Sequence, residues 1–98
     1  MNSKRLIIRG DVQAVGFRQW MVEQAQRLGV AGWVRNRSDG TVEALVAGDT
    51  AAVEELLRAC RRGPRLAHVA SIEEELVEPD DPNVAVNLGR GFQQLPSA

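Results

Sequence analysis

Gly10-Asp11-Val12-Gln13-Ala14-Val15-Gly16-Phe17-Arg18 is the stretch around which the rest of this 98-residue chain is arranged. An apolar run at 6–8 precedes it and predicts a strand, and a helical pattern of apolar residues follows it. A loop of small residues between a strand and a helix directs backbone N–H groups into one concavity of partial positive charge. Arg18 closes the loop, and a guanidinium pairs well with phosphate oxygens. The stretch therefore predicts a cradle for an oxyanion or phosphate group.

The remaining elements follow from apolar periodicity and turn residues. Strands are expected at 4–9, 30–37, 41–47 and 66–77, the last with a bulge because its apolar residues change phase. Helices are expected at 17–28, ending at Gly29, and from a cap at Asp49 or Thr50 to Gly63-Pro64, with Glu54–Arg58 as an i,i+4 pair. The apolar stripe of the first helix is Phe17, Met21, Ala25 and Leu28, and that of the second is Val53, Leu56, Leu57 and Cys60.

The order of these elements is β-α-β-β-α-β, with residues 92–95 as a candidate short final strand that Pro96 ends. This order predicts an α+β fold of the ferredoxin-like, split β-α-β type, with an antiparallel sheet and two helices on one face. Ser38-Asp39-Gly40 is the expected hairpin turn, and Glu73-Glu74-Glu75 is expected on a solvated edge strand. We expect one domain over 1–98, with its core at about 4–79 and an uncertain tail at 80–98.

Composition excludes several classes of function. The net charge is −1 and 44% of residues are apolar, so we expect neither nucleic acid nor a membrane as partner. One cysteine and one histidine do not form a metal site, so we expect no metal and no cofactor. Cys60 is expected in the core and His68 at a strand end. The single cysteine and the absence of a signal peptide or membrane span favour the cytoplasm, and a monomer is the default.

Two separated motifs resemble the acylphosphatase family. The first is Gly10-x-Val12-Gln13-x-Val15-x-Phe17-Arg18, and the second is Gly32-Trp33-Val34-x-Asn36-x-x-x-Gly40-Thr41-Val42. The likeness extends from about Arg5 to Pro79 and includes Gly63-Pro64. From the residues alone, Asn36 is better interpreted as an ordinary residue before a turn, and only the resemblance favours a role in chemistry.

The resemblance implies hydrolysis of acyl phosphates to a carboxylate and inorganic phosphate, without a metal. In that family the loop arginine, here Arg18, clamps the phosphate, and the asparagine, here Asn36, orients the attacking water. Gly10, Gly40 and Thr41 would support the site, and inorganic phosphate would be both product and inhibitor. The loop amides expected to bind phosphate are those of Val12, Gln13, Ala14, Val15, Gly16 and Phe17.

The chemistry of the substrate agrees with so small a set of groups. A carboxylate leaving group has a conjugate acid of pKa about 4 and needs no general acid. Phosphoryl transfer through a loose transition state mainly requires charge stabilisation and positioning. A phosphate oxygen of the substrate can accept the proton of the water, so the reaction requires no histidine.

The chain departs from the family pattern at two places. Ala14 stands where the family most often has glycine, and we expect it to adopt a negative φ angle. The segment 84–98 lacks the usual alternating last strand, so we expect no tail residue in the site. Which acyl phosphate is the physiological substrate stays open.

Three alternatives to a free-standing enzyme differ in features of the sequence. A non-catalytic anion- or nucleotide-binding module on the same fold would not need both Arg18 and Asn36, which are intact here. A piece of a hydrogenase-maturation carbamoyltransferase would belong to a far longer chain with zinc-finger cysteines. An RNA-recognition module would need strand aromatics and a basic face, which are missing.

Overall fold

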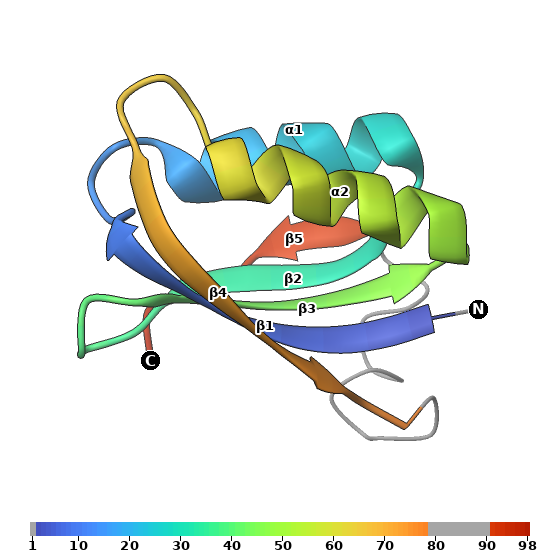
Figure 1. Cartoon of the computed structure of the whole chain (residues 1–98). Helices are drawn as coiled ribbons and strands as arrows, with labels where there is room; N and C mark the ends of the chain where they lie inside the picture. The colour runs from blue at the N-terminus through green and yellow to red at the C-terminus, as the bar shows by residue number, and fades with distance from the viewer. Residues whose placement is uncertain (1, 79–90) are drawn as a thin grey trace.

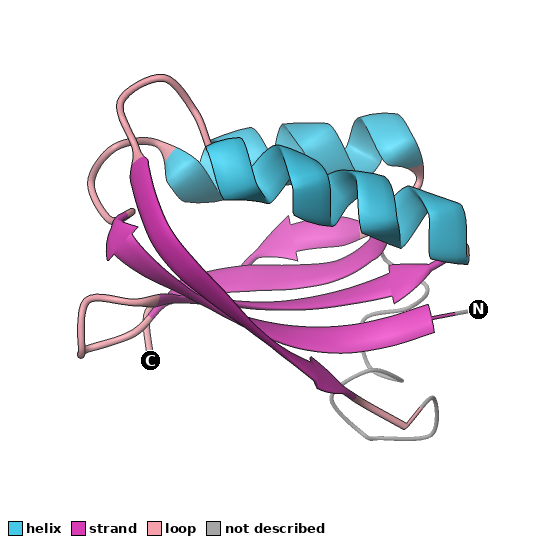
Figure 2. Ribbon diagram, viewed as in Figure 1, coloured by secondary structure: helices cyan, strands magenta, loops and turns pink. Residues whose placement is uncertain are grey.

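Two helices cover one face of a five-stranded sheet (Figures 1 and 2). The computed structural model describes residues 2–78 and 91–98. The elements are β1 (Asn2–Asp11), α1 (Phe17–Leu28), β2 (Ala31–Asn36), β3 (Val42–Gly48), α2 (Thr50–Arg62), β4 (His68–Leu76) and β5 (Phe92–Gln94). Their order across the sheet is β4-β1-β3-β2-β5. The expected ferredoxin-like arrangement is confirmed.

The sheet is mixed, whereas the sequence predicted an antiparallel one. Strands β1 to β4 pair antiparallel, as expected, but β5 runs parallel to β2. The candidate final strand therefore forms, over Phe92–Gln94, and Gly32 of β2 lies opposite Phe92 in the register. Residues 79–90, which include most of the expected tail, lie outside the described residues.

The core lies between the helices and the sheet because each element has an apolar face of the right period. In β1, Leu6 and Ile8 are buried beneath the helices, and Ile7 is buried too. The predicted stripes of both helices are buried, with Leu28 only partly so. Cys60 belongs to this core, and burial raises the pKa of its thiol to about 12.

Strand β4 lies at the edge of the sheet and contains the expected bulge. Arg9 of β1 lies opposite Ser71 and Gly10 lies opposite Val69, so Ala70 has no partner in the register. Gly10 has φ +128, and a Cβ there would lie 2.1 Å from the backbone oxygen of His68. Glycine is thus required where the two strands approach closely. It also lies within β1, so the loop begins two residues later than expected.

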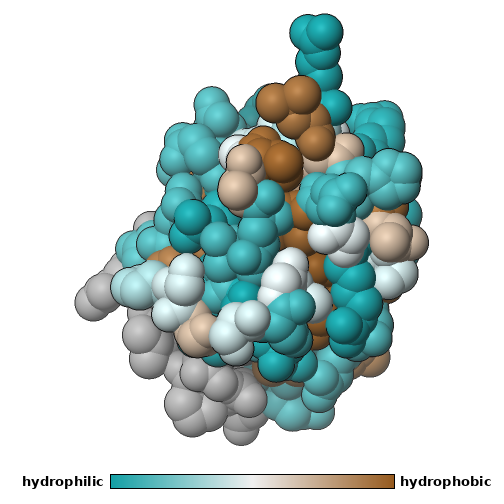
Figure 3. Space-filling view, turned by 90° about the vertical axis from the view of Figure 1, so that its left-hand side faces the viewer, coloured by the Kyte–Doolittle hydropathy of each residue, from teal (hydrophilic) through white to brown (hydrophobic). Residues whose placement is uncertain are grey.

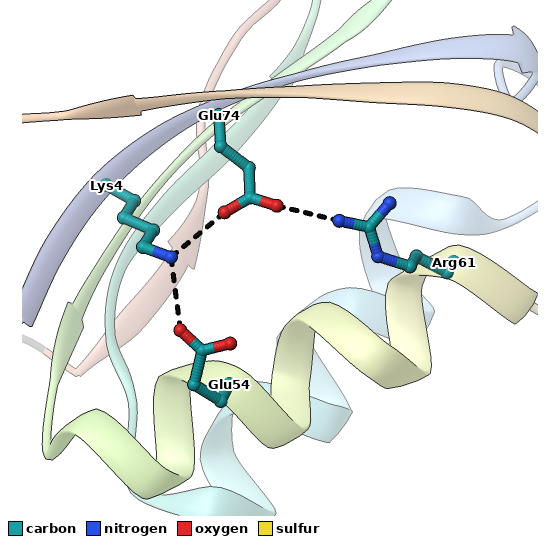
Figure 4. Close-up of polar contacts among 4 residues, drawn as sticks. All are labelled: Lys4, Glu54, Arg61 and Glu74. Atoms are coloured by element: carbon teal, nitrogen blue, oxygen red, sulfur yellow. Dashed lines mark hydrogen bonds and ion pairs between the residues drawn. The ribbon is translucent and has the colours of Figure 1, made fainter.

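An ion-pair network joins β1, α2 and β4 (Figure 4). The Nζ of Lys4 lies 3.1 Å from Oε1 of Glu54 and 2.9 Å from Oε1 of Glu74. Arg61 contacts the other oxygen of Glu74 at 2.7 Å. The expected Glu54–Arg58 pair is wrong, because Glu54 instead reaches across to Lys4 on the neighbouring strand.

The helix starts and the hairpin turn are where the sequence placed them. Asp49 is the N-cap residue of α2, although its side chain makes no capping hydrogen bond. The turn at 38–40 is closed by Asp39, whose Oδ1 accepts hydrogen bonds from the backbone N–H and the hydroxyl of Thr41.

Within residues 2–78 and 91–98, neither helix has the length and apolarity needed to cross a bilayer.

Candidate active site

The loop between β1 and α1 presents an uncapped helix N-terminus. Gly16 is the N-cap residue of α1, with φ 79 and ψ 14, and no side chain caps the helix. The first turn of α1 also contains no acidic residue. The first N–H groups of a helix have no partner within the helix and carry its positive dipole end. This end of α1 is therefore suited to an anion.

Ala14 adopts φ 61, so the expectation of a negative φ angle there is wrong. It is the only non-glycine residue with positive φ among those the structure describes. Gly16, two residues later, also has positive φ. Alternation of negative and positive φ turns successive N–H groups toward one side of the chain, which forms an anion-binding concavity. The loop thus holds Ala14 in the left-handed conformation, which residues with a Cβ disfavour.

A cavity of about 120 Å³ opens beside this loop, which is large enough to hold several water molecules. Its lining combines the loop, the start of α1, the end of β2 and β5. The lining residues are Val12, Ala14, Gly16, Phe17, Arg18, Gln19, Asn36 and Gln94. Arg18 and Asn36, which are 18 residues apart in the sequence, therefore meet at one cavity.

The cavity belongs to the end of the molecule where the β1–α1 loop and the β2–β3 hairpin lie, at the left of Figure 1. Figure 3 looks onto that end and shows hydrophobic side chains between hydrophilic ones along the middle of the face. Among residues 2–78 and 91–98, no carboxylate forms a salt bridge with Arg18. Within this part of the chain its guanidinium has no carboxylate partner, so it is suited to pairing with an external anion.

Asn36 contributes a buried amide oxygen. Among the described residues, no donor lies within hydrogen-bond distance of its Oδ1. A buried carbonyl without a partner is costly, and each such case calls for an explanation. Asn36 lines the adjoining cavity, although this oxygen is itself closed to solvent.

The side chain of Gln13 does not line the cavity. It donates from Nε2 to the backbone oxygen of Arg37 at 2.7 Å and to that of Thr41 at 2.8 Å. Thr41 is buried, and Gly40 occupies the turn with φ +89. Both therefore belong to the hairpin that follows Asn36, while Val15 packs against the core.

Gln19 and Gln94 are cavity residues that the sequence did not reveal. The Nε2 of Gln94 donates to Oε1 of Gln19 at 3.2 Å, so β5 closes one side of the cavity. A tail residue, Gln94, therefore lines this cavity, whereas the sequence led us to expect no tail residue in the site. One signal was present: Gln94 lies two residues after the apolar Phe92, and alternate residues of a strand share a face.

Metal-ligating residues do not gather anywhere in the described part of the chain, where no group of three or more His, Cys, Asp or Glu side chains could hold an ion. Cys60 is fully buried, and His68 is exposed at the start of β4, as expected.

Comparison with known proteins identifies one family. The acylphosphatase family model matches residues 4–92. A curated acylphosphatase of Acidiphilium cryptum (strain JF-5) is 68% identical over 79 residues, which are 81% of this chain and 87% of that protein. An acylphosphatase structure from Bacillus subtilis has a TM-score of 0.85 at 30% identity. The match covers 97% of this chain and 99% of the Bacillus subtilis chain. A full-length HypF, in a phosphate- and nucleotide-bound form, has a TM-score of 0.83 at 27% identity; the match covers 98% of this chain and 12% of that one.

Proposed function

Because this chain belongs to the acylphosphatase family and hydrolyses acyl phosphates to a carboxylate and inorganic phosphate, we propose that the cavity beside the β1–α1 loop is its active site. The observation that carries this assignment is the meeting of Arg18 and Asn36 at the uncapped start of α1. These two side chains belong to separate elements, α1 and β2, and both residues line this one cavity.

The phosphoryl group is held by the loop amides and Arg18. Backbone N–H groups in the left-handed turn at Ala14 and Gly16 and at the start of α1 donate to its oxygens. The guanidinium of Arg18 forks onto two of them. Because these donors are already oriented before the substrate arrives, they stabilise the charge on the phosphoryl oxygens in the transition state.

The attacking water is held by Asn36. Asn36 lines the cavity, and its side-chain amide orients the water so that a lone pair is directed to phosphorus. The carboxylate leaves without protonation, since its conjugate acid has a pKa of about 4. A phosphate oxygen takes up the proton of the water. The amides and Arg18 supply the charge stabilisation that a metal ion provides in other phosphoryl-transfer sites.

The surroundings in which the enzyme acts are also part of the proposal. It works in the cytoplasm as a monomer on a small-molecule substrate, without nucleic acid or membrane. A net charge of −1 gives no long-range attraction to polyanions. Cys60 is a buried core thiol, as is common in a reducing compartment.

The first test is turnover of benzoyl phosphate with and without excess EDTA. We expect equal rates, because the proposed donors all come from the chain. A loss of most activity that added Mg²⁺ restores would overturn the metal-free mechanism. Binding of inorganic phosphate without any turnover would instead indicate an anion-binding module.

The second test separates the two side chains. Arg18→Ala should weaken competitive inhibition by inorganic phosphate and also abolish turnover, because Arg18 contacts phosphate in both ground and transition states. Asn36→Ala should lower kcat by about 10²–10³ or more while phosphate still inhibits. Arg27→Ala, an exposed arginine at the other end of the same helix, is the control and should leave both quantities unchanged. Equal loss of phosphate affinity in the Arg18 and Asn36 variants would contradict this division of roles.

A further inference from the structure

The side chain of Gln13 connects the β1–α1 loop to the β2–β3 hairpin. Its backbone lies in the β1–α1 loop, where we place the phosphate, and its side chain leaves the loop for the β2–β3 hairpin. There, both hydrogens of its amide are used, on the oxygens of Arg37 and Thr41 at 2.7 and 2.8 Å. The partners are 24 and 28 residues away in the sequence.

The two carbonyl groups mark the neck of the hairpin. Arg37 directly follows Asn36, and its own N–H donates to the oxygen of Thr41 at 2.9 Å. Its carbonyl also accepts from the N–H of Gly40 at 3.2 Å. An uncharged side chain that donates to both oxygens at once must be an amide, and Gln13 has the length to reach them.

The hairpin has its own closing hydrogen bonds and does not need Gln13 to form. The turn is held by the Arg37–Thr41 and Gly40–Arg37 backbone bonds and by the bonds of Thr41 to Asp39. What the Gln13 side chain adds is a link between this hairpin and the loop. Without that link, the neck of the hairpin next to Asn36 would have no hydrogen bond to the loop among the described side chains.

Asn36 is held in place through its backbone, which pairs with Val42 and accepts a hydrogen bond from the N–H of Ala98 at 2.9 Å. Its Oδ1 has no donor among the described residues, so that oxygen receives no orientation from a neighbour. It is also the last residue of β2, opposite Val42 in the register. The position of its side chain therefore follows the position of the hairpin neck.

We propose that Gln13 is a positioning residue that sets the distance between the bound phosphate and the water held by Asn36. This inference rests on the proposed function, in which the loop holds phosphate and Asn36 holds water. Displacement of a reacting group by about 1 Å can lower a rate by about 10²-fold. Gln13 itself touches neither substrate nor water through its side chain.

The test is a double-mutant cycle of Gln13→Met and Asn36→Ala. Methionine matches the length of glutamine and lacks both donors. We expect Gln13→Met to lower kcat about 10- to 100-fold, with the inhibition constant for inorganic phosphate changed less than about threefold, because the loop amides and Arg18 remain. The double variant should turn over no more slowly than Asn36→Ala alone, since Gln13 acts through Asn36. Gln26→Met, at an exposed position of α1, is the matched control and should behave as the parent.

A second readout does not depend on residual turnover. In the phosphate-saturated protein, the side-chain NH₂ signals of Asn36 in ¹⁵N-resolved NMR should shift in Gln13→Met and not in Gln26→Met. The indole signal of Trp33, in the same strand, should stay in place in both variants. Unfolding in urea is measured alongside, so that turnover is compared only where every variant is folded.

Several results would overturn the positioning role. The first two are an unchanged kcat in a Gln13→Met variant that is only less stable, and a kcat in the double variant that equals the product of the two single losses. The other two are Asn36 NH₂ signals that do not shift in Gln13→Met, and a loss of phosphate affinity in Gln13→Met as large as its loss of kcat. Each of these leaves the proposed function standing if Asn36→Ala alone is strongly impaired. An unimpaired Asn36→Ala would instead contradict the proposed function and the positioning role together.

Discussion

Ala14 shows how a single residue can carry strain at a site. It has φ 61 in the loop that we assign to phosphate, a conformation that costs an L-residue roughly 1–2 kcal/mol. Such strain persists where the surrounding structure enforces it and is often found at functional sites. The domain retains Ala14 in this conformation because β1 and α1 fix both ends of the loop.

Ala14→Gly should therefore stabilise the protein. Glycine removes about 1–2 kcal/mol of strain but adds about 0.4–1 kcal/mol of unfolded-state entropy cost, so the net gain should lie between zero and about 1.6 kcal/mol. Turnover should change little, because the N–H groups stay in place. Urea midpoints and kcat of the pair measure both effects.

A matched control has the opposite expected sign. Ala51 lies exposed in the first turn of α2, and Ala51→Gly should destabilise the protein by up to about 0.5 kcal/mol, since glycine lowers helix stability but costs less near a helix end than in its middle. If Ala14→Gly were as destabilising as this control, the left-handed conformation of Ala14 would be contradicted.

At the scale of elements, ion pairs between charged side chains link neighbouring strands, in addition to the apolar contacts of the core. Glu43 of β3 is 5% exposed and accepts from Nε of Arg5 on β1 and Nε of Arg35 on β2, both at 2.7 Å. The guanidinium of Arg35 also lies 4.9 Å from the ring centroid of Trp33, within reach of a cation–π contact. Burial raises the pKa of Glu43, but the hydrogen bonds and charges of Arg35 and Arg5 outweigh it, and the net shift is downward.

This shift makes stability depend on pH in the acid range. A carboxylate with a folded pKa below its ordinary value of 4.5 stabilises the fold above that value, and the contribution is lost as pH falls through the folded pKa. Glu43→Gln should cost about 1–3 kcal/mol at pH 7, as for hydrogen bonds to a charged group. Its deficit relative to the parent should shrink below pH 4.5. Urea unfolding at pH 7 and at pH 3 measures this.

The control for that experiment is Glu55→Gln. Glu55 is exposed on α2 and forms no salt bridge among residues 2–78 and 91–98. Its variant should match the parent at both pH values. A Glu43→Gln deficit that stayed constant from pH 7 to pH 3 would show that the Arg5–Glu43–Arg35 cluster does not lower the pKa of this carboxyl.

The bounds of elements were predictable where local signals agree and less so where they do not. Helix α1 matches its predicted range because an apolar stripe and the left-handed Gly29 define it. Strand β4 runs over His68–Leu76 and is shorter than the predicted 66–77. Leu66, which the prediction included, lies outside the strand and is 76% exposed although it is apolar. Hydropathy indicates that a residue favours burial, but the packing of the rest of the molecule decides whether space exists for it.

For the whole molecule, the sequence by itself determined the order of elements, the two helical stripes and the motifs that contain Arg18 and Asn36. These depend on spacings of two to four residues, or on short motifs, and such patterns are local. The ferredoxin-like arrangement follows from their order.

Only the tertiary structure decided the parallel pairing of β5 with β2, the entry of Gln94 into the cavity, the φ angle of Ala14 and the partners of Gln13. Each of these depends on groups that are distant in the chain, or on a loop whose ends are fixed by packed elements. No local pattern encodes such a choice, because the free energy that selects it comes from close packing and hydrogen bonding across the finished sheet and core.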